Sequence, residues 1–310
     1  MARPNGSKSG TGRRGAKRTS PFMSRTGRGA RTFDFRSVPP VRSRKKNEVW
    51  MLTQAQQLLK TRDLVFAWTI RTLRGRYQQS ALGWLWAVVQ PVATVAIFAI
   101  VFTRIVPVDT GGVPYILFSY TAVVPWTLLA TSLTDMAMSL VQNMNLVGKI
   151  YFPREALPIA ALLARIADFG ISFVLLVILV MIYGIPVLPL GLLFLPLIFL
   201  IQLALILGLG IGSAALNVFY RDVDPFLKLI IQIWFYASPI LYPLSLVPVK
   251  WQWLYFLNPM SGIIAAYRDV LIYNRLPGDY LLPAAVVSLV IFAAGYWFFK
   301  RVEFQFADII

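Results

Sequence analysis

The sequence of 310 residues contains no cysteine and no histidine. The absence of cysteine excludes disulfide bonds and thiol chemistry. The absence of histidine removes the commonest metal ligand and the commonest proton shuttle near neutral pH. We find no set of nucleophile, base and orienting group among the remaining residues, so we expect no catalytic site in this chain.

Charged residues are also scarce. They make up 14% of the chain, against about 25% in a soluble domain, whereas hydrophobic residues make up 57%. Several uncharged runs reach the roughly 20 residues that a helix needs to cross the hydrocarbon core of a membrane. The composition therefore predicts an all-α, polytopic integral membrane protein.

The net charge of +17 is concentrated at the N-terminus, where residues 1–46 contain 14 Lys and Arg residues and one acid, Asp34. This segment is rich in Gly, Ser and Arg and has too little apolar surface to form a core. We predict a disordered basic tail over residues 1–46 that contacts anionic lipid, followed by a transmembrane domain over residues 47–310. Nucleic-acid binding by the tail is the less favoured alternative, and we expect no nucleic-acid partner.

Six segments have the length and composition of membrane spans. They cover residues 83–106, 115–133, 157–183, 187–216, 225–242 and 280–299. Before the first span, residues 50–73 show a helical repeat of apolar residues with a basic polar face, which predicts an amphipathic helix at the membrane surface. Residues 247–267 are apolar but contain Lys250, Asn258 and three helix-breaking residues, so we predict re-entrant or interfacial helices before the last span.

The distribution of Lys and Arg predicts the orientation in the membrane. Six spans place both termini on one side, and the side richer in Lys and Arg is normally cytoplasmic. Most Lys and Arg residues lie in the tail, in residues 60–76 and in the loops on the same side of the membrane. Only Arg104, Lys250, Arg268 and Arg275 fall on the other side. We therefore predict that both termini are cytoplasmic.

Two groups of charges near the predicted spans favour structural ion pairs. Arg165 and Asp168 lie three residues apart in the third span, where a charge is costly unless it is paired. Asp135, near the end of the second span, is placed to join them. After the fourth span, Arg221 and Asp222 predict a second ion pair in a tight turn. Asp224 beside them leaves open a metal site or acid–base chemistry, but the other ligands that such a site needs are missing.

The loop over residues 143–158 reads NMNLVGKIYFPREALP and mixes apolar with charged residues. Pro153 and Pro158 bracket the start of the third span. This composition is compatible with a solvated connection. It also fits a short helix that lies beneath the membrane and docks a cytoplasmic partner.

Six segments in this order resemble the membrane subunit of bacterial ABC-2-type exporters, which transport polysaccharides such as O-antigen, capsule and teichoic-acid chains. The matching segments are RYQQSALGWLWAVVQP, NLVGKIYFPREALP, LNVFYRDV, SPILYP, LNPMSGIIAAYRDVL and FKRVEFQFADII. The resemblance covers about residues 55–310 and leaves out residues 1–46.

The resemblance implies a permease subunit in the bacterial inner membrane, with two copies forming the channel and binding two copies of a cytoplasmic ABC ATPase. It implies that the residues that couple to the ATPase are Asn145, Lys149, Phe152, Pro153 and Arg154. It also implies an interface or gate helix that includes Lys60, Arg62, Arg71, Arg74, Arg76 and Tyr77. The chain has no nucleotide-binding motif of its own. We therefore expect it not to be an enzyme and to hold no cofactor, with ATP and Mg²⁺ used by the partner subunit.

The substrate implied by the resemblance is a glycan, attached in many members of the family to a polyprenyl-diphosphate lipid. Candidates for contact with the diphosphate or with lipid headgroups are Arg268 and Arg275 on the outer side and Arg71, Arg74 and Arg76 on the inner side. We favour the inner group, because loading starts inside and arginine suits phosphate. The alternatives are an exporter of the same architecture for a drug or small lipid, and a membrane-embedded glycan-processing enzyme.

Overall fold

The computed structural model describes residues 23–25, 31–33, 62–78, 80–147 and 152–306. The chain divides into two compact units, Met1–Met51 and Leu52–Ile310. All helices of the described part belong to the second unit.

The described residues of the first unit form a small antiparallel hairpin. β1 (Met23–Arg25) pairs with β2 (Arg31–Phe33), and Met23 lies opposite Phe33. These six residues lie within the segment predicted to be a disordered tail, which stays a prediction. The rest of the predicted tail lies outside the described residues.

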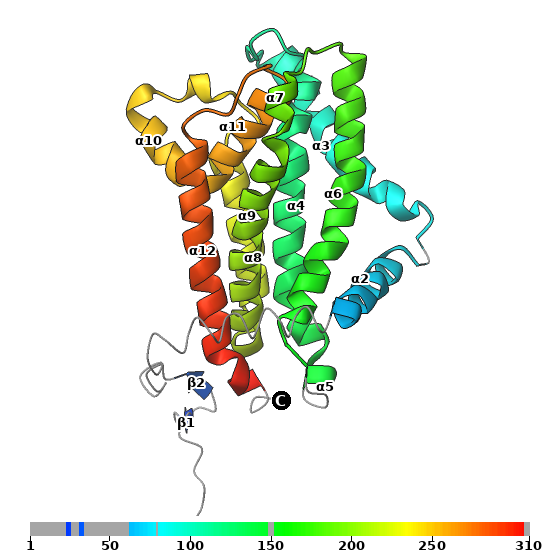
Figure 1. The fold of residues 1–310 in the computed structure, drawn as a ribbon, viewed down its shortest axis with the longest axis vertical. Helices are drawn as coiled ribbons and strands as arrows, with labels where there is room; N and C mark the ends of the chain where they lie inside the picture. The colour runs from blue at the N-terminus through cyan, green and yellow to red at the C-terminus, as the bar shows by residue number, and fades with distance from the viewer. Residues whose placement is uncertain (1–22, 26–30, 34–61, 79, 148–151, 307–310) are drawn as a thin grey trace, which may run out of the picture. The chain divides into compact units, whose positions relative to one another are not determined.

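The second unit contains, within its described residues, five helical segments long and apolar enough to cross a membrane (Figure 1). They cover Gly83–Ile105, Tyr115–Gln142, Ala156–Ile182, Pro189–Phe219 and Leu281–Gln305. Each coincides with one of the predicted spans. The second continues to Gln142 instead of ending at residue 133, because its last turns, which include Asp135, are covered by neighbouring helices.

The five segments are built from the following helical elements. The first contains η2 (Gly83–Leu85), α3 (Trp86–Ile100) and the wider π turn η3 (Val101–Ile105). The second and third are α4 (Tyr115–Gln142) and α6 (Ala156–Ile182), with the short α5 (Met144–Val147) between them. The fourth contains α7 (Pro189–Leu192) and α8 (Leu195–Phe219), and the last contains α12 (Leu281–Val302) and η5 (Glu303–Gln305).

The span predicted over residues 225–242 corresponds to a shorter helix, α9 (Val223–Ala237). Its 15 residues extend about 22 Å, less than the roughly 30 Å hydrocarbon core. The helix ends there because Ser238 precedes Pro239, and a residue before proline is driven into the extended conformation that Ser238 adopts (φ −104°, ψ 150°).

Two short helices occupy the segment predicted to be re-entrant. After the short turn η4 (Leu244–Leu246), α10 (Val249–Leu257) and α11 (Pro259–Leu271) meet at Asn258. The Asn258 side chain caps α11 by accepting a backbone N–H of its first turn at 3.1 Å. Trp234 of α9 donates its indole N–H to the same oxygen at 2.8 Å. Asn-Pro at this point therefore explains why an apolar segment forms two helices and not one span.

α4 is the most buried of the five segments, and polar side chains of α8 are bonded to it. Gln202 donates to the carbonyl oxygen of Pro125 at 2.8 Å, and Asn217 donates to that of Ala137 at 2.9 Å. Between helices in a membrane, such hydrogen bonds hold partners together where apolar surfaces alone give little preference for protein over lipid.

α8 and α12 cross closely at two glycines. A methyl group on Gly295 would overlap the carbonyl oxygen of Gly208, and one on Gly208 would lie 2.6 Å from the carbonyl oxygen of Ile291. The absence of side chains at both positions lets the two backbones touch.

We therefore expect Gly295→Ala to destabilise the detergent-solubilised protein by about 1–3 kcal/mol, because the two helices must separate. Thermal unfolding measures this. Gly170→Ala in α6 is the control, since a methyl group there meets no atom within 4 Å and should not lower the unfolding temperature. Equal unfolding temperatures for both variants and the wild type would contradict the close crossing.

Candidate functional site

α2 (Arg62–Tyr77) lies beside α6 and is held partly by apolar contacts (Figure 1). These contacts form a cluster of Val65, Trp68, Phe152, Ala156, Ile159 and Ala160. Phe152 comes from the loop predicted to couple to an ATPase. The predicted interface helix and the predicted coupling loop therefore share one apolar contact.

α2 is less amphipathic than predicted. Val65 is buried, but the neighbouring Phe66 is 65% exposed, so apolar side chains occur on both faces of the helix. The described helix begins at Arg62, and Lys60, predicted to be part of it, lies outside the described residues. Residues 62–73 of the predicted repeat lie in α2, and residues 50–61 lie outside the described residues.

Four charged side chains from three helices form one connected network, which we name the charged quartet. They are Arg76 of α2, Asp135 of α4, and Arg165 and Asp168 of α6. Arg76 donates to Asp135 and to Asp168, each at 2.6 Å. Arg165 donates to Asp135 at 2.7 Å and lies 3.3 Å from Asp168. Each arginine therefore contacts both acids, and Arg165 and Asp168 meet as their spacing predicts.

The charged quartet is electrically balanced and largely shielded from water. Its side chains are between 12% and 27% exposed. Two cations and two anions compensate one another where an isolated charge would be costly. Next along α2, Tyr77 donates its hydroxyl to the second oxygen of Asp168. Burial, reinforced by Asp168, raises the pKa of Tyr77 to about 12, so this hydroxyl keeps its proton at neutral pH.

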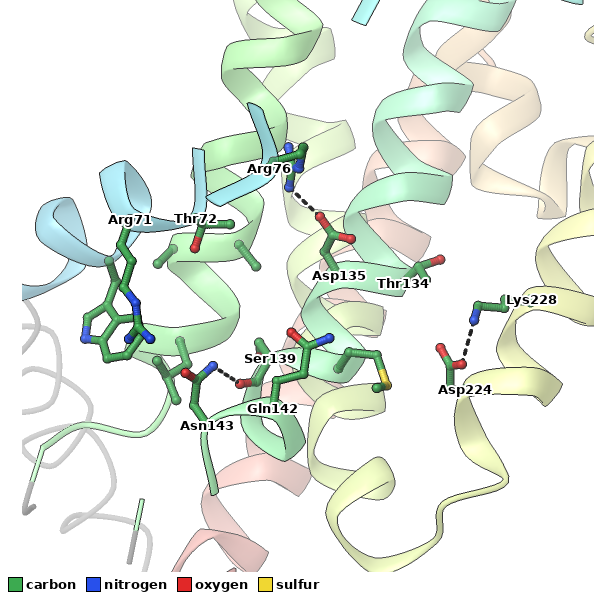
Figure 2. A pocket seen from close by; sticks show the side chains of 15 residues that line it. Arg71, Thr72, Arg76, Thr134, Asp135, Ser139, Gln142, Asn143, Asp224 and Lys228 are labelled. Carbon is green, nitrogen blue, oxygen red and sulfur yellow. Dashed lines mark hydrogen bonds and ion pairs between the residues drawn. The ribbon is translucent and has the colours of Figure 1, made fainter. Parts of the chain in front are cut away.

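The charged quartet borders a hollow of about 630 Å³ between α2 and α9, lined also by α4 and α6 (Figure 2). Hydroxyl and amide groups line it, from Thr72, Thr134, Ser139, Gln142 and Asn143. Arg71 lies on the α2 side and Lys228 on the α9 side (Figure 2). The Arg71 guanidinium stacks 4.4 Å from the centre of the Trp68 ring. Lys228 is paired with Asp224, which also lines the hollow. The hollow can therefore offer hydrogen bonds and the Arg71 cation to a polar, anionic ligand.

The remaining residues predicted for the interface helix face away from the hollow. Arg62 and Arg74 are exposed, and neither lines it. Arg62 lies 3.6 Å from the equally exposed Asp63. An ion pair between two side chains in solvent contributes little to stability.

The residues predicted to couple to an ATPase have different surroundings. Asn145 is exposed on α5, whereas Pro153 is half-buried. Phe152 joins the apolar cluster, and Arg154 donates a hydrogen bond to a carbonyl of η5. Lys149 lies outside the described residues.

The turn after α8 departs from the prediction. Within the described residues, Arg221 and Asp222 are exposed and are not brought together as an ion pair. The paired acid is Asp224, which accepts from Lys228 at 2.6 Å. Arg221 and Asp222 are both in solvent, where an ion pair gains little, whereas Asp224 and Lys228 lie four residues apart on α9 and face each other. Nor do acids in the described part of the chain gather as a metal site.

Two features of this region were not predicted from the sequence. Lys228 lines the hollow, and Glu155 accepts from Lys300 at 2.7 Å. Glu155 and Lys300 are 145 positions apart, so no helical spacing relates them.

Replacing Arg76 with Met should destabilise the protein by about 1–3 kcal/mol, because two shielded carboxylates then share one arginine. Unfolding of the purified protein by heat or denaturant measures the change. Arg74→Met, which removes an exposed cation from the same helix turn, should change stability by no more than about 0.5 kcal/mol. A similar effect of both substitutions would contradict the role of the charged quartet.

Comparison with known proteins agrees with this architecture. The model of the ABC-2 type transporter family matches residues 63–272. The O-antigen export system permease protein RfbA of Myxococcus xanthus is 30% identical over 263 residues, which cover 84% of this chain and 100% of that protein. A protein of the same name from Klebsiella pneumoniae is 28% identical over 248 residues, or 80% of this chain and 95% of that protein. The chain therefore belongs to the ABC-2 type transporter family, as a multi-pass membrane permease.

Proposed function

We propose that this chain is the permease subunit of an exporter that moves a lipid-linked polysaccharide across the bacterial inner membrane. One observation above all supports this function. A polar hollow of about 630 Å³ lies at one end of an apolar helix bundle, and its lining includes Asn143 and Leu157, which lie near the two ends of the predicted coupling loop. The names of the similar proteins, O-antigen export permeases, support a polysaccharide as the cargo.

The lining of the hollow suits the polar end of such a substrate. Hydroxyl and amide side chains can exchange hydrogen bonds with sugar hydroxyls, and a diphosphate requires cations. Arg71 projects from α2 beside the hollow, and its stacking on Trp68 orients the guanidinium. Arg76, by contrast, already binds two carboxylates. We therefore assign the phosphate contact on the inner side to Arg71.

The energy would come from a separate subunit. Membership of the ABC-2 type transporter family implies association with an ABC ATPase. We propose that two copies of the chain form the channel and that two ATPase copies bind ATP and Mg²⁺. Asn145 of α5, which is exposed, and residues 152–154 would receive the ATPase. Phe152 shares a cluster with Val65 of α2, so a movement of this loop would reach α2 directly.

We further propose six spans, with α9 as the fifth and with α10 and α11 re-entrant on the outer side. Both termini would then be cytoplasmic. The contact between Lys300 and Glu155 supports this topology, because it places the end of α12 beside the start of α6. Arg154, Arg221 and Arg301 add positive charge to the same group of helix ends, as expected on the cytoplasmic side.

Deleting the gene should abolish one surface polysaccharide and cause its lipid-linked form to accumulate inside the cell, because the export step is missing. Extraction of the surface and intracellular glycan pools measures both effects, and the wild-type gene should reverse them. Unchanged glycan pools, together with a new sensitivity to a drug or an altered small lipid, would support the alternative exporter instead.

Arg71→Met should lower the rate of export about fivefold at matched membrane levels of the protein, because one charge-assisted contact to phosphate is lost. The rate is measured from the appearance of labelled polysaccharide at the cell surface. Arg74→Met, one helical turn further along and outside the hollow, is the matched control. Equal rates for the two variants would remove Arg71 from the substrate site.

A further inference from the structure

A second group of contacts joins the predicted coupling loop to the opposite side of the bundle from α2. At its centre, Lys300 of α12 donates to Glu155 at 2.7 Å, and both residues are buried, with side chains 4% and 0% exposed. Lys300 also lies 3.0 Å from Glu303 of η5. We name these three residues, together with Arg154 and Phe306, the terminal clasp.

The terminal clasp has a second set of bonds through Arg154. This arginine donates to the backbone carbonyl of Glu303, and its guanidinium lies 5.6 Å from the centre of the Phe306 ring. Phe306 in turn packs against Phe219 at the end of α8, with ring centres 5.8 Å apart. The clasp therefore connects the loop to the cytoplasmic ends of both α12 and α8.

The coupling loop thus acts as a junction over four consecutive residues. Phe152 packs on α2, whereas Arg154 and Glu155 bind the end of α12. Glu155 also caps the start of α6, since its carbonyl accepts the amide of Ile159 at 3.1 Å. While the buried pair of Glu155 and Lys300 is intact, a displacement of this segment that moves α2 and α6 must also move α12.

Stability alone is a weak explanation for a buried ion pair. Removing two charges from water is costly, and apolar residues of similar volume often stabilise a fold equally well or better. In some proteins a buried polar or ionic group instead specifies the register between the segments that it joins. Here the segments are the loop that would meet the ATPase and the last helix of the permease.

On the basis of the proposed function, we propose that Glu155 and Lys300 are positioning residues for ATP-driven export. Their pair transmits movement of the ATPase-bound loop to α12 and, through Phe306, to α8. The apolar cluster transmits the same movement to α2. Breaking the pair should therefore uncouple ATP hydrolysis from export while the complex remains assembled.

The test uses the full complex of permease and ATPase with two readouts. ATP hydrolysis is measured on the purified complex, and surface polysaccharide is measured in cells and divided by the amount of assembled complex. The variants are Lys300→Met and the double variant Glu155→Gln with Lys300→Met. The double variant removes the ionic link without leaving the fully buried Glu155 charge unpaired. Glu303 also loses its partner, but its side chain is 25% exposed and can contact water, so the double variant should fold even if the single variant does not. Arg301→Met, the next residue of α12, is the matched control.

Both clasp variants should lower surface polysaccharide per complex by about fivefold or more, with ATP hydrolysis within about twofold of wild type. The control should leave both readouts within about twofold. Recovery of export in the double variant would overturn the inference, because it would show that only the unpaired charge was harmful. A loss of surface polysaccharide that is fully explained by a smaller amount of assembled complex would also overturn the inference. If the wild-type complex itself does not restore surface polysaccharide to a deletion strain, the proposed function fails, whatever the variants do.

Discussion

The charged quartet holds the last turn of α2 on the bundle, while the apolar cluster around Val65 holds its first turns. Arg76 binds acids on α4 and α6 at once, which a planar guanidinium with donors on several edges can do and an ammonium group does less well. Because Arg165 supplies the second positive charge, the group is neutral and tolerates its shielded position. The hollow beside it exists because α2 is held here, with its cations facing polar residues on α4.

Most of the ion pairs in the described residues lie near one end of the helices, apart from Asp269–Arg275, whereas the middles of the helices are packed by other means. α8 has no charged residue and contacts its neighbours through glycines and through Gln202 and Asn217. Such contacts oppose the sliding of one helix along another. The charged quartet, the hollow and the terminal clasp all involve the last turns of α4 or α12 or the first turns of α6. A movement imposed on the coupling loop would therefore act where the polar contacts are and be carried along rigid helices.

Features with a local cause were predictable from the sequence. Of the contacts between distant residues, the approach of Asp135 to Arg165 was predicted, but most others were not. Apolar run length gave five of the spans, and the three-residue spacing of Arg165 and Asp168 predicted their contact. The end of α9 also has a local cause, Pro239. The prediction missed it because it relied on the length of the apolar run. By contrast, Arg76 lies 92 positions from Asp168 and 59 from Asp135, so only the packing of α2 on α6 brings them together. The predicted pairing of Arg221 with Asp222 was wrong, because both side chains are exposed to solvent, where an ion pair gains little.

The central claim is that Arg76 and Asp168 act as one unit that connects α2 to the spans during export. A double-mutant cycle tests it most directly, with Arg76→Met, Asp168→Asn and the combination measured as surface polysaccharide per assembled complex. If the two residues act together, the double variant should export no less than the weaker of the two single variants. If the two losses instead multiply, as they do for independent sites, the claim is contradicted.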